Sequence, residues 1–169
     1  VPDHAGALAA AEELSRDPGL LAANASFFAD VISGEIAAAE RSGRDEEADG
    51  LRIRLAALRG DHLQDTAGAL ALLEEVLARH PGHGEALARV ERAMAHDHER
   101  AGAILEKAYT ATGRHEPLAA MLTERLPRLG EAGGAVALRL GALLEGPLER
   151  PSEAPHFYEE ARRLDPALA

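Results

Sequence analysis

The chain contains two copies of a long segment, and this internal repetition constrains its fold more than any other feature. Residues 51–81 align with residues 136–166 over 31 positions without a gap. Nine of these positions are identical: Arg54/Arg139, Leu55/Leu140, Ala57/Ala142, Leu58/Leu143, Leu63/Leu148, Ala69/Ala154, Glu74/Glu159, Glu75/Glu160 and Pro81/Pro166. Such repetition is typical of arrays in which each unit buries its apolar face against a neighbour. We therefore expect a repeat protein.

A second echo sets the expected domain organisation. The stretch PDHAGALAAAE that begins at Pro2 matches PGHGEALARVE from Pro81, so a boundary recurs at Pro2, Pro81 and Pro166. We predict a first four-helix repeat unit over residues 1–81 and a second over residues 82–169. The two units are expected to form one continuous solenoid domain, cut from a longer array.

The spacing of apolar residues predicts helices. Apolar residues make up 46% of the chain and aromatic residues only 3%, so the core must consist mainly of Ala and Leu, the best helix formers. The clearest helix is predicted over 66–79, where Ala69, Leu73 and Val76 share one face. Shorter stripes of helical spacing begin at Leu8, Phe28, Leu51, Leu87, Ile104, Leu118, Val136 and Phe157.

Residues that end or begin helices agree with this periodicity. Five glycines follow apolar stripes, where a left-handed C-cap favours glycine: Gly43, Gly60, Gly113, Gly130 and Gly146. Three acceptors stand where an N-cap is expected: Asp65, Asp97 and Ser152. The resulting fold class is all-α, a right-handed α-solenoid of nine or ten short helices in antiparallel pairs, without strands.

Part of each copy resembles the tetratricopeptide repeat. Ala69, Leu73, Val76 and Pro81 have the spacing of the later consensus positions of that family, and Ala154, Tyr158, Ala161 and Pro166 repeat it. Residues 101–126 look like the intervening helix pair of long tetratricopeptide-type proteins from high-GC bacteria. The resemblance implies a TPR-like helical repeat with degenerate repeats, a bacterial source, and a concave groove that binds peptides or protein surfaces.

Charge and composition exclude several classes of function. The net charge is −11, whereas nucleic-acid binders carry a basic surface that neutralises phosphates. No apolar run approaches the roughly 20 residues of a membrane span, so no membrane insertion is expected. The chain has no Cys, which excludes disulfides and thiolate sites. Localisation stays open, with the cytoplasm favoured.

Two patterns suggest a metal site or acid–base catalysis, but each is better explained as ordinary turn or surface residues. His80 with His83, and His96 with His98, flank turns in which loop histidines bind Zn²⁺ in other proteins, but no HExxH motif or Cys supports them. Paired glutamates such as Glu74-Glu75 point about 100° apart on a helix, which suits a solvated face better than acid–base catalysis. We therefore predict no catalytic, metal or cofactor-binding residue and no cofactor, and hence no enzyme.

The function expected from the resemblance is that of a scaffold or adaptor that binds a protein or peptide. Candidate binding residues are Arg52, Arg54 and Arg139, whose guanidinium groups suit carboxylates, and Phe27 as an exposed apolar anchor. Self-association is a further option for the same surface. A structural spacer in a longer solenoid is the alternative, and a metal-dependent enzyme is the third hypothesis.

Overall fold

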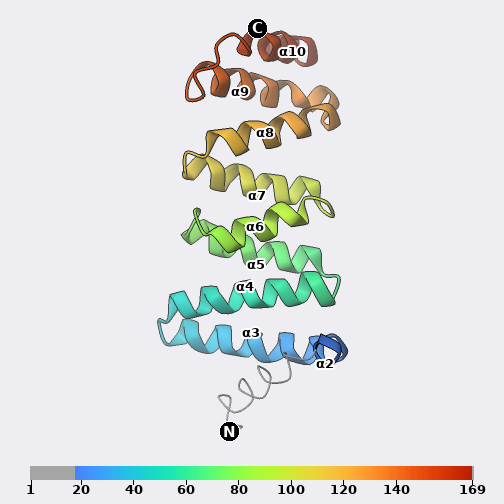
Figure 1. Cartoon of the computed structure of the whole chain (residues 1–169), viewed down its shortest axis with the longest axis vertical. Helices are drawn as coiled ribbons and strands as arrows, with labels where there is room; N and C mark the ends of the chain where they lie inside the picture. Colours follow the sequence, from blue (N-terminus) through green and yellow to red (C-terminus); the bar gives the residue numbers. More distant parts are fainter. Residues whose placement is uncertain (1–17, 169) are drawn as a thin grey trace. The chain divides into compact units, whose positions relative to one another are not determined.

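The computed structural model describes residues 18–168, and within this range the chain is helical and contains no strand (Figure 1). The all-α prediction is therefore confirmed for this part of the chain. The first predicted stripe, which begins at Leu8, lies outside the described residues. Within the described range no helix has the length and apolar character needed to cross a membrane.

The chain divides into two compact units, the first ending at Leu105 and the second beginning at Glu106. The described helices of the first unit are α2 (Pro18–Ala23), α3 (Ala25–Arg41), α4 (Asp45–His62), α5 (Thr66–Arg79), α6 (Gly84–Ala93) and the first part of α7 (His98–Ala111). From α3 to α6, consecutive helices reverse direction at short turns and lie side by side (Figure 1).

The second unit contains the rest of α7 and three further α-helices. They are α8 (His115–Arg125), α9 (Gly134–Glu145) and α10 (Ala154–Leu164), with short 3₁₀ turns η1 (Leu126–Arg128), η2 (Gly130–Gly133) and η3 (Pro166–Leu168). Residues 82–169 thus include five α-helices, α6 to α10, where the repeat pattern predicted four.

The helix predicted over 66–79 is confirmed with the same bounds, since α5 spans Thr66–Arg79. Asp65 caps it by accepting a hydrogen bond from the Gly68 backbone N–H at 2.8 Å. Asp97 likewise accepts from the Arg100 N–H at 3.0 Å at the start of α7. Ser152 does not cap α10, because the helix starts at Ala154, with no side-chain cap bond.

Each unit buries its own apolar side chains. In the first unit, α3 and α4 share a cluster formed by Ala25, Phe28, Ala29, Ile32, Ile36, Leu51, Leu55 and Leu58. In the second unit, Leu118 and Leu122 of α8 and Leu140 of α9 are almost fully buried. Burial of apolar area at about 25 cal/mol per Å² is the main source of stability for such helix pairs.

Of the five expected glycine caps, one is misplaced and one is a cap without the left-handed conformation. Gly43 and Gly113 have φ of +68° and +65°, and the residue after each donates to the carbonyl five positions back, as in a Schellman motif. Gly130 also has a positive φ, of +53°. Gly60, however, lies inside α4, and Gly146 is the C-cap of α9 with a φ of −90°, outside the left-handed region. In both copies the left-handed residue comes a few positions later.

The left-handed residues at these later turns are Gln64 and Glu149, with φ of +55° and +53°. They occupy the same position in the two aligned copies. Their turns also share hydrogen bonds: Leu63 N–H donates to Leu58 C=O at 3.3 Å, and Leu148 N–H donates to Leu143 C=O at 3.0 Å. The sequence repetition is therefore matched by repetition of backbone geometry, in the α4–α5 turn and the α9–α10 turn.

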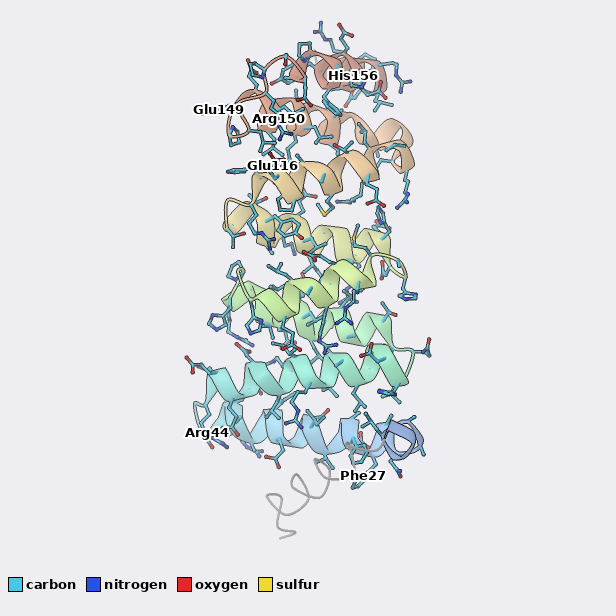
Figure 2. The ribbon with its side chains drawn as sticks, viewed as in Figure 1. Phe27, Arg44, Glu116, Glu149, Arg150 and His156 are labelled. Atoms are coloured by element: carbon cyan, nitrogen blue, oxygen red, sulfur yellow. The ribbon has the colours of Figure 1, made fainter. Side chains whose placement is uncertain are left out.

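The residues that follow Gln64 and Glu149 also form equivalent hydrogen bonds in the two copies. Asp65 N–H donates to Arg59 C=O at 2.9 Å, and Arg150 N–H donates to Leu144 C=O at 2.6 Å. The Arg150 side chain also forms an ion pair with Glu116 of α8 at 2.5 Å (Figure 2).

Glycine at either turn is expected to stabilise the chain. A left-handed backbone destabilises a residue with a Cβ by roughly 1–2 kcal/mol, and glycine avoids this strain. Glycine also raises the entropy of the unfolded chain, which offsets part of the gain. Gln64→Gly or Glu149→Gly should therefore raise the free energy of unfolding by about 0.5–1 kcal/mol, measured by urea denaturation. Gln64→Ala, which keeps the Cβ, is the control and should bring no gain. A loss of stability in both glycine variants would contradict the assignment of strain.

A pair of facing positions differs between the two copies. In α9, a Cβ at Gly141 would lie only 2.6 Å from Cδ1 of Tyr158, so the absence of a side chain admits the aromatic ring of α10. The aligned positions in the first copy are Ala56 of α4 and Leu73 of α5, both buried. A larger side chain on one helix thus accompanies a smaller one on the other, as close packing requires.

Candidate functional site

The first unit has a hollow of about 320 Å³ among α2, α3, α4 and α6. Its floor is apolar and consists of Leu21, Phe28, Ile32, Ala57 and Leu58. Its rim is polar and consists of Arg54, Asp61, His62, Glu85 and Arg89. We call it the first hollow. Its volume lies at the small end of ligand sites, which run from about 300 to 1,000 Å³, so it suits one or two side chains.

A second hollow, of about 240 Å³, lies among α4, α5, α6 and the turn after α6. Its apolar wall includes Ala56, Ala69, Leu70, Leu73 and Ala93. Its polar residues are Asp61, Thr66, Arg89, Arg92 and His96. Because Asp61 and Arg89 line both hollows, the two adjoin, and we call them together the α4–α6 groove.

Arg89 stands where the two hollows meet. Its side chain is only 20% exposed, with Nε 3.3 Å from Glu85 Oε1 and Nη1 3.7 Å from Asp61 Oδ2. These two carboxylates compensate its charge, since a half-buried guanidinium needs a partner. Arg89 thereby braces α6 against α4 along the groove.

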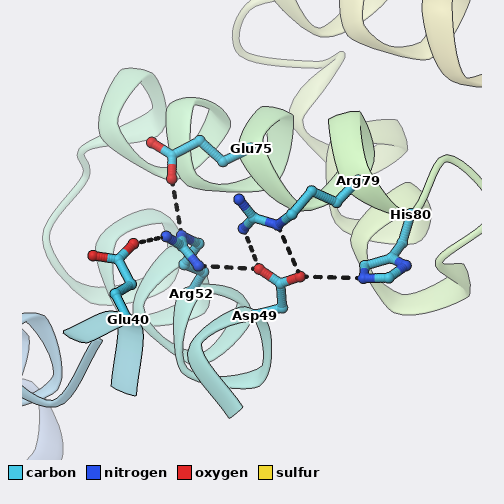
Figure 3. Close-up of polar contacts among 6 residues, drawn as sticks. All are labelled: Glu40, Asp49, Arg52, Glu75, Arg79 and His80. Carbon is cyan, nitrogen blue, oxygen red and sulfur yellow. Dashed lines mark hydrogen bonds and ion pairs between the residues drawn. The ribbon is translucent and has the colours of Figure 1, made fainter. Parts of the chain in front are cut away.

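The first unit also contains an ion network with a buried centre and exposed outer members, where α3, α4 and α5 meet (Figure 3). The side chains of Asp49 and Arg52 are each 6% exposed, and Arg52 Nη1 donates to Asp49 Oδ1 at 3.0 Å. Arg52 also donates to Glu75 Oε2 at 2.9 Å and to Glu40.

Asp49 has further partners at the end of α5. Arg79 Nε donates to Asp49 Oδ2 at 3.1 Å, and His80 Nε2 lies 3.4 Å from the same oxygen. Burial acts to raise the pKa of the Asp49 carboxyl, but the hydrogen bond from Arg79 and the nearby positive charges of Arg79 and Arg52 outweigh it and lower that pKa. Asp49 therefore stays ionised and fully partnered, which suits a clamp between helices and not an acid or base.

No protein-family model, no curated protein and no solved structure matches the chain. The interpretation of the groove therefore rests on its own residues. An apolar floor with charged walls can hold an apolar side chain and orient the polar groups beside it.

The four predicted binding residues lie in different places. Arg52 and Arg54 are two positions apart on α4, so they point to opposite sides of the helix. Arg52 belongs to the ion network, whereas Arg54 is exposed and lines the first hollow. Phe27 of α3 is 59% exposed, and its ring centroid lies 5.8 Å from that of Phe28, which forms part of the floor (Figure 2).

Arg139 lies in the second unit. It forms an ion pair with Glu106, and its Nη2 donates to Thr110 Oγ1 at 2.6 Å. Both partners belong to α7, and Arg125 of α8 also pairs with Glu106, at 3.1 Å. Arg139 thus links α9 to α7 within this unit.

The histidines considered as metal ligands have individual roles. His83 caps α6, since its Nδ1 accepts from the Ala86 N–H at 3.3 Å, while His80 faces Asp49 and His96 lines the second hollow. Over residues 18–168 there is no group of three or more His, Asp or Glu side chains placed to hold a metal ion.

The groove residues on α6 were not among the sequence-based candidates. Glu85, Arg89 and Arg92 follow one another at i, i+4 and i+7, so they form a row on one face of a strongly amphipathic helix. The row reads in the sequence as an ordinary solvated face. Only its position opposite Asp61 of α4 distinguishes it.

Proposed function

We propose that the chain is a protein-interaction module of the tetratricopeptide type, with helix pairs in a right-handed solenoid, that binds a peptide segment in the α4–α6 groove. The single observation that carries the proposal is the pair of neighbouring hollows, which share Asp61 and Arg89 and are lined by apolar and charged side chains. The tetratricopeptide-like spacing of Ala69, Leu73, Val76 and Pro81, and the antiparallel helices of the first unit, also support it.

Binding is favoured over catalysis for a physical reason. A general acid or base needs a pKa near the working pH, whereas nearby cations lower the pKa of Asp49, the most buried carboxylate in residues 18–168. The shapes of the hollows suit side chains of a partner chain, in the manner of apolar anchors at interfaces.

Filling the first hollow is expected to abolish peptide binding. Ala57 is half-buried in the floor, and Ala57→Phe places a ring where an anchor side chain would enter. Fluorescent nine-residue peptide libraries with a fixed Phe serve as ligands, and their affinity is measured by anisotropy. The affinity of Ala57→Phe should be at least about tenfold lower than that of the unaltered chain, or 1.4 kcal/mol. Hydrogen exchange of the unaltered chain with bound peptide should show protection in α4 and α6.

Ala88→Phe is the matched control, because Ala88 is exposed on α6 and lines neither hollow. It should bind the libraries as the unaltered chain does, and circular dichroism should show both variants folded. Equal binding by Ala57→Phe would exclude the groove as the site. If the unaltered chain binds no library at millimolar concentration, the spacer hypothesis replaces this proposal.

A further inference from the structure

The walls of the α4–α6 groove differ in charge from the chain as a whole. The chain carries a net charge of −11. The groove walls have three arginines, Arg54, Arg89 and Arg92, against two carboxylates, Asp61 and Glu85. A basic groove in an acidic protein favours an acidic ligand.

The two carboxylates are already paired. Asp61 lies 3.7 Å and Glu85 3.3 Å from Arg89, so this one arginine offsets much of their charge. The Arg92 side chain, by contrast, makes no hydrogen bond or ion pair with any residue in 18–168. Arg92 is exposed in the second hollow, where its planar guanidinium is available to hold a carboxylate with two hydrogen bonds.

The rise along α6 from Glu85, on the rim of the first hollow, to Arg92 in the second sets the spacing expected of the ligand. Glu85 lines the first hollow, and Arg92 lines the second, seven residues further along α6. At 1.5 Å per residue this corresponds to roughly 10 Å. An extended peptide rises about 3.3 Å per residue, so the same distance is covered by about three residues.

We infer that the α4–α6 groove binds an extended acidic peptide segment in which a bulky apolar side chain and a carboxylate side chain stand about three residues apart. The apolar side chain enters the first hollow, over Phe28, Ile32 and Leu58, and the carboxylate binds Arg92 in the second. This inference rests on the proposed function and adds the chemistry and the register of the partner.

Synthetic peptide libraries test the inference. Each nine-residue library has Phe at its third position and Ala, Ser, Thr or Gly elsewhere, with Glu at the sixth position, Lys at the sixth, or Glu at the fourth. The library with Glu at the sixth position should bind at least about tenfold tighter than the library with Lys there. It should also bind tighter than the library with Glu at the fourth, which falls short of Arg92.

A charge reversal supplies the second arm. Arg92→Glu should invert the preference, so that the Lys library binds tighter than the Glu library. Arg41→Glu is the control, because Arg41 is exposed on α3 and lines neither hollow, and the same change of net charge there should leave the preference intact.

The outcomes separate the two proposals. Equal binding of the Glu and Lys libraries, with both lost in Ala57→Phe, would overturn the acidic ligand and leave peptide binding in place. A preference that survives Arg92→Glu would overturn the role of Arg92. If no library binds the unaltered chain, the proposed function fails, and this inference with it.

Discussion

Leu140→Asp is expected to unfold the second unit. Leu140 of α9 has no exposed area and belongs to the buried apolar core of the second unit. An aspartate there would therefore bury a charge without a counter-ion. The expected loss exceeds about 4 kcal/mol, a large part of the 5–15 kcal/mol that stabilises a typical domain. Far-UV circular dichroism should lose helical signal, and amides of α8 to α10 should lose protection from hydrogen exchange.

The neighbouring leucine provides the control. Leu138 lies two residues away on the same helix but is 39% exposed, so Leu138→Asp should cost only about 1 kcal/mol and keep the helices intact. Leu73→Asp is the equivalent test in the first unit, since Leu73 is 2% exposed on α5. Unchanged spectra and melting for both Leu140→Asp and Leu73→Asp would contradict the buried cores described above.

Asp49→Asn is expected to destabilise the first unit by about 3 kcal/mol. Removal of one charge from a buried pair leaves the other without compensation, which typically costs about 3–5 kcal/mol. Arg52 keeps Glu40 and Glu75, so the lower end of that range applies, while Arg79 loses its carboxylate partner. Urea denaturation should show the loss, with hydrogen exchange increased where α3, α4 and α5 meet.

Two further measurements identify charge as the cause. Asp30→Asn makes the same chemical change at an exposed site on α3 and should stay within about 0.5 kcal/mol of the unaltered chain. The pKa of Asp49 is lower in the folded chain than in the unfolded chain, so its contribution is complete above about pH 4 and is lost as the pH falls through the folded pKa. The stability difference between the unaltered chain and Asp49→Asn should therefore narrow below about pH 4. A constant difference down to pH 2 would contradict this role.

Much of the local structure could be predicted because its causes lie close together in the sequence. The bounds of α5 follow from one apolar stripe and the Asp65 cap, and Gly43 and Gly113 end their helices as expected. Gly60 misled because a glycine after a stripe does not end a helix that continues to bury its apolar face, whereas Gly146 does end α9 but without the left-handed backbone that was expected. Leu63, three residues after Gly60, packs on the first core, and the turn forms there.

The candidate site depended on long-range contacts that local patterns do not encode. Asp49 looks like a solvated residue in the sequence, yet its main partner Arg79 is thirty residues away. Arg54 could be proposed from its identity with Arg139, but the structure gives the two arginines different surroundings. Arg89 and Arg92 line the groove only because α6 packs beside α4 and α5, which their own sequence neighbourhood does not indicate.

The contact between Gly141 and Tyr158 bears on how the two copies diverged. If both descend from a common ancestor with Ala and Leu, as at positions 56 and 73, the order of the two substitutions was constrained. Ala to Gly first costs a helix roughly 0.5–1 kcal/mol, a tolerable step. Leu to Tyr first would force the ring against a Cβ that, at Gly141, would lie 2.6 Å from the Cδ1 atom of Tyr158. From such an ancestor, glycine before tyrosine is the less costly order of the two substitutions.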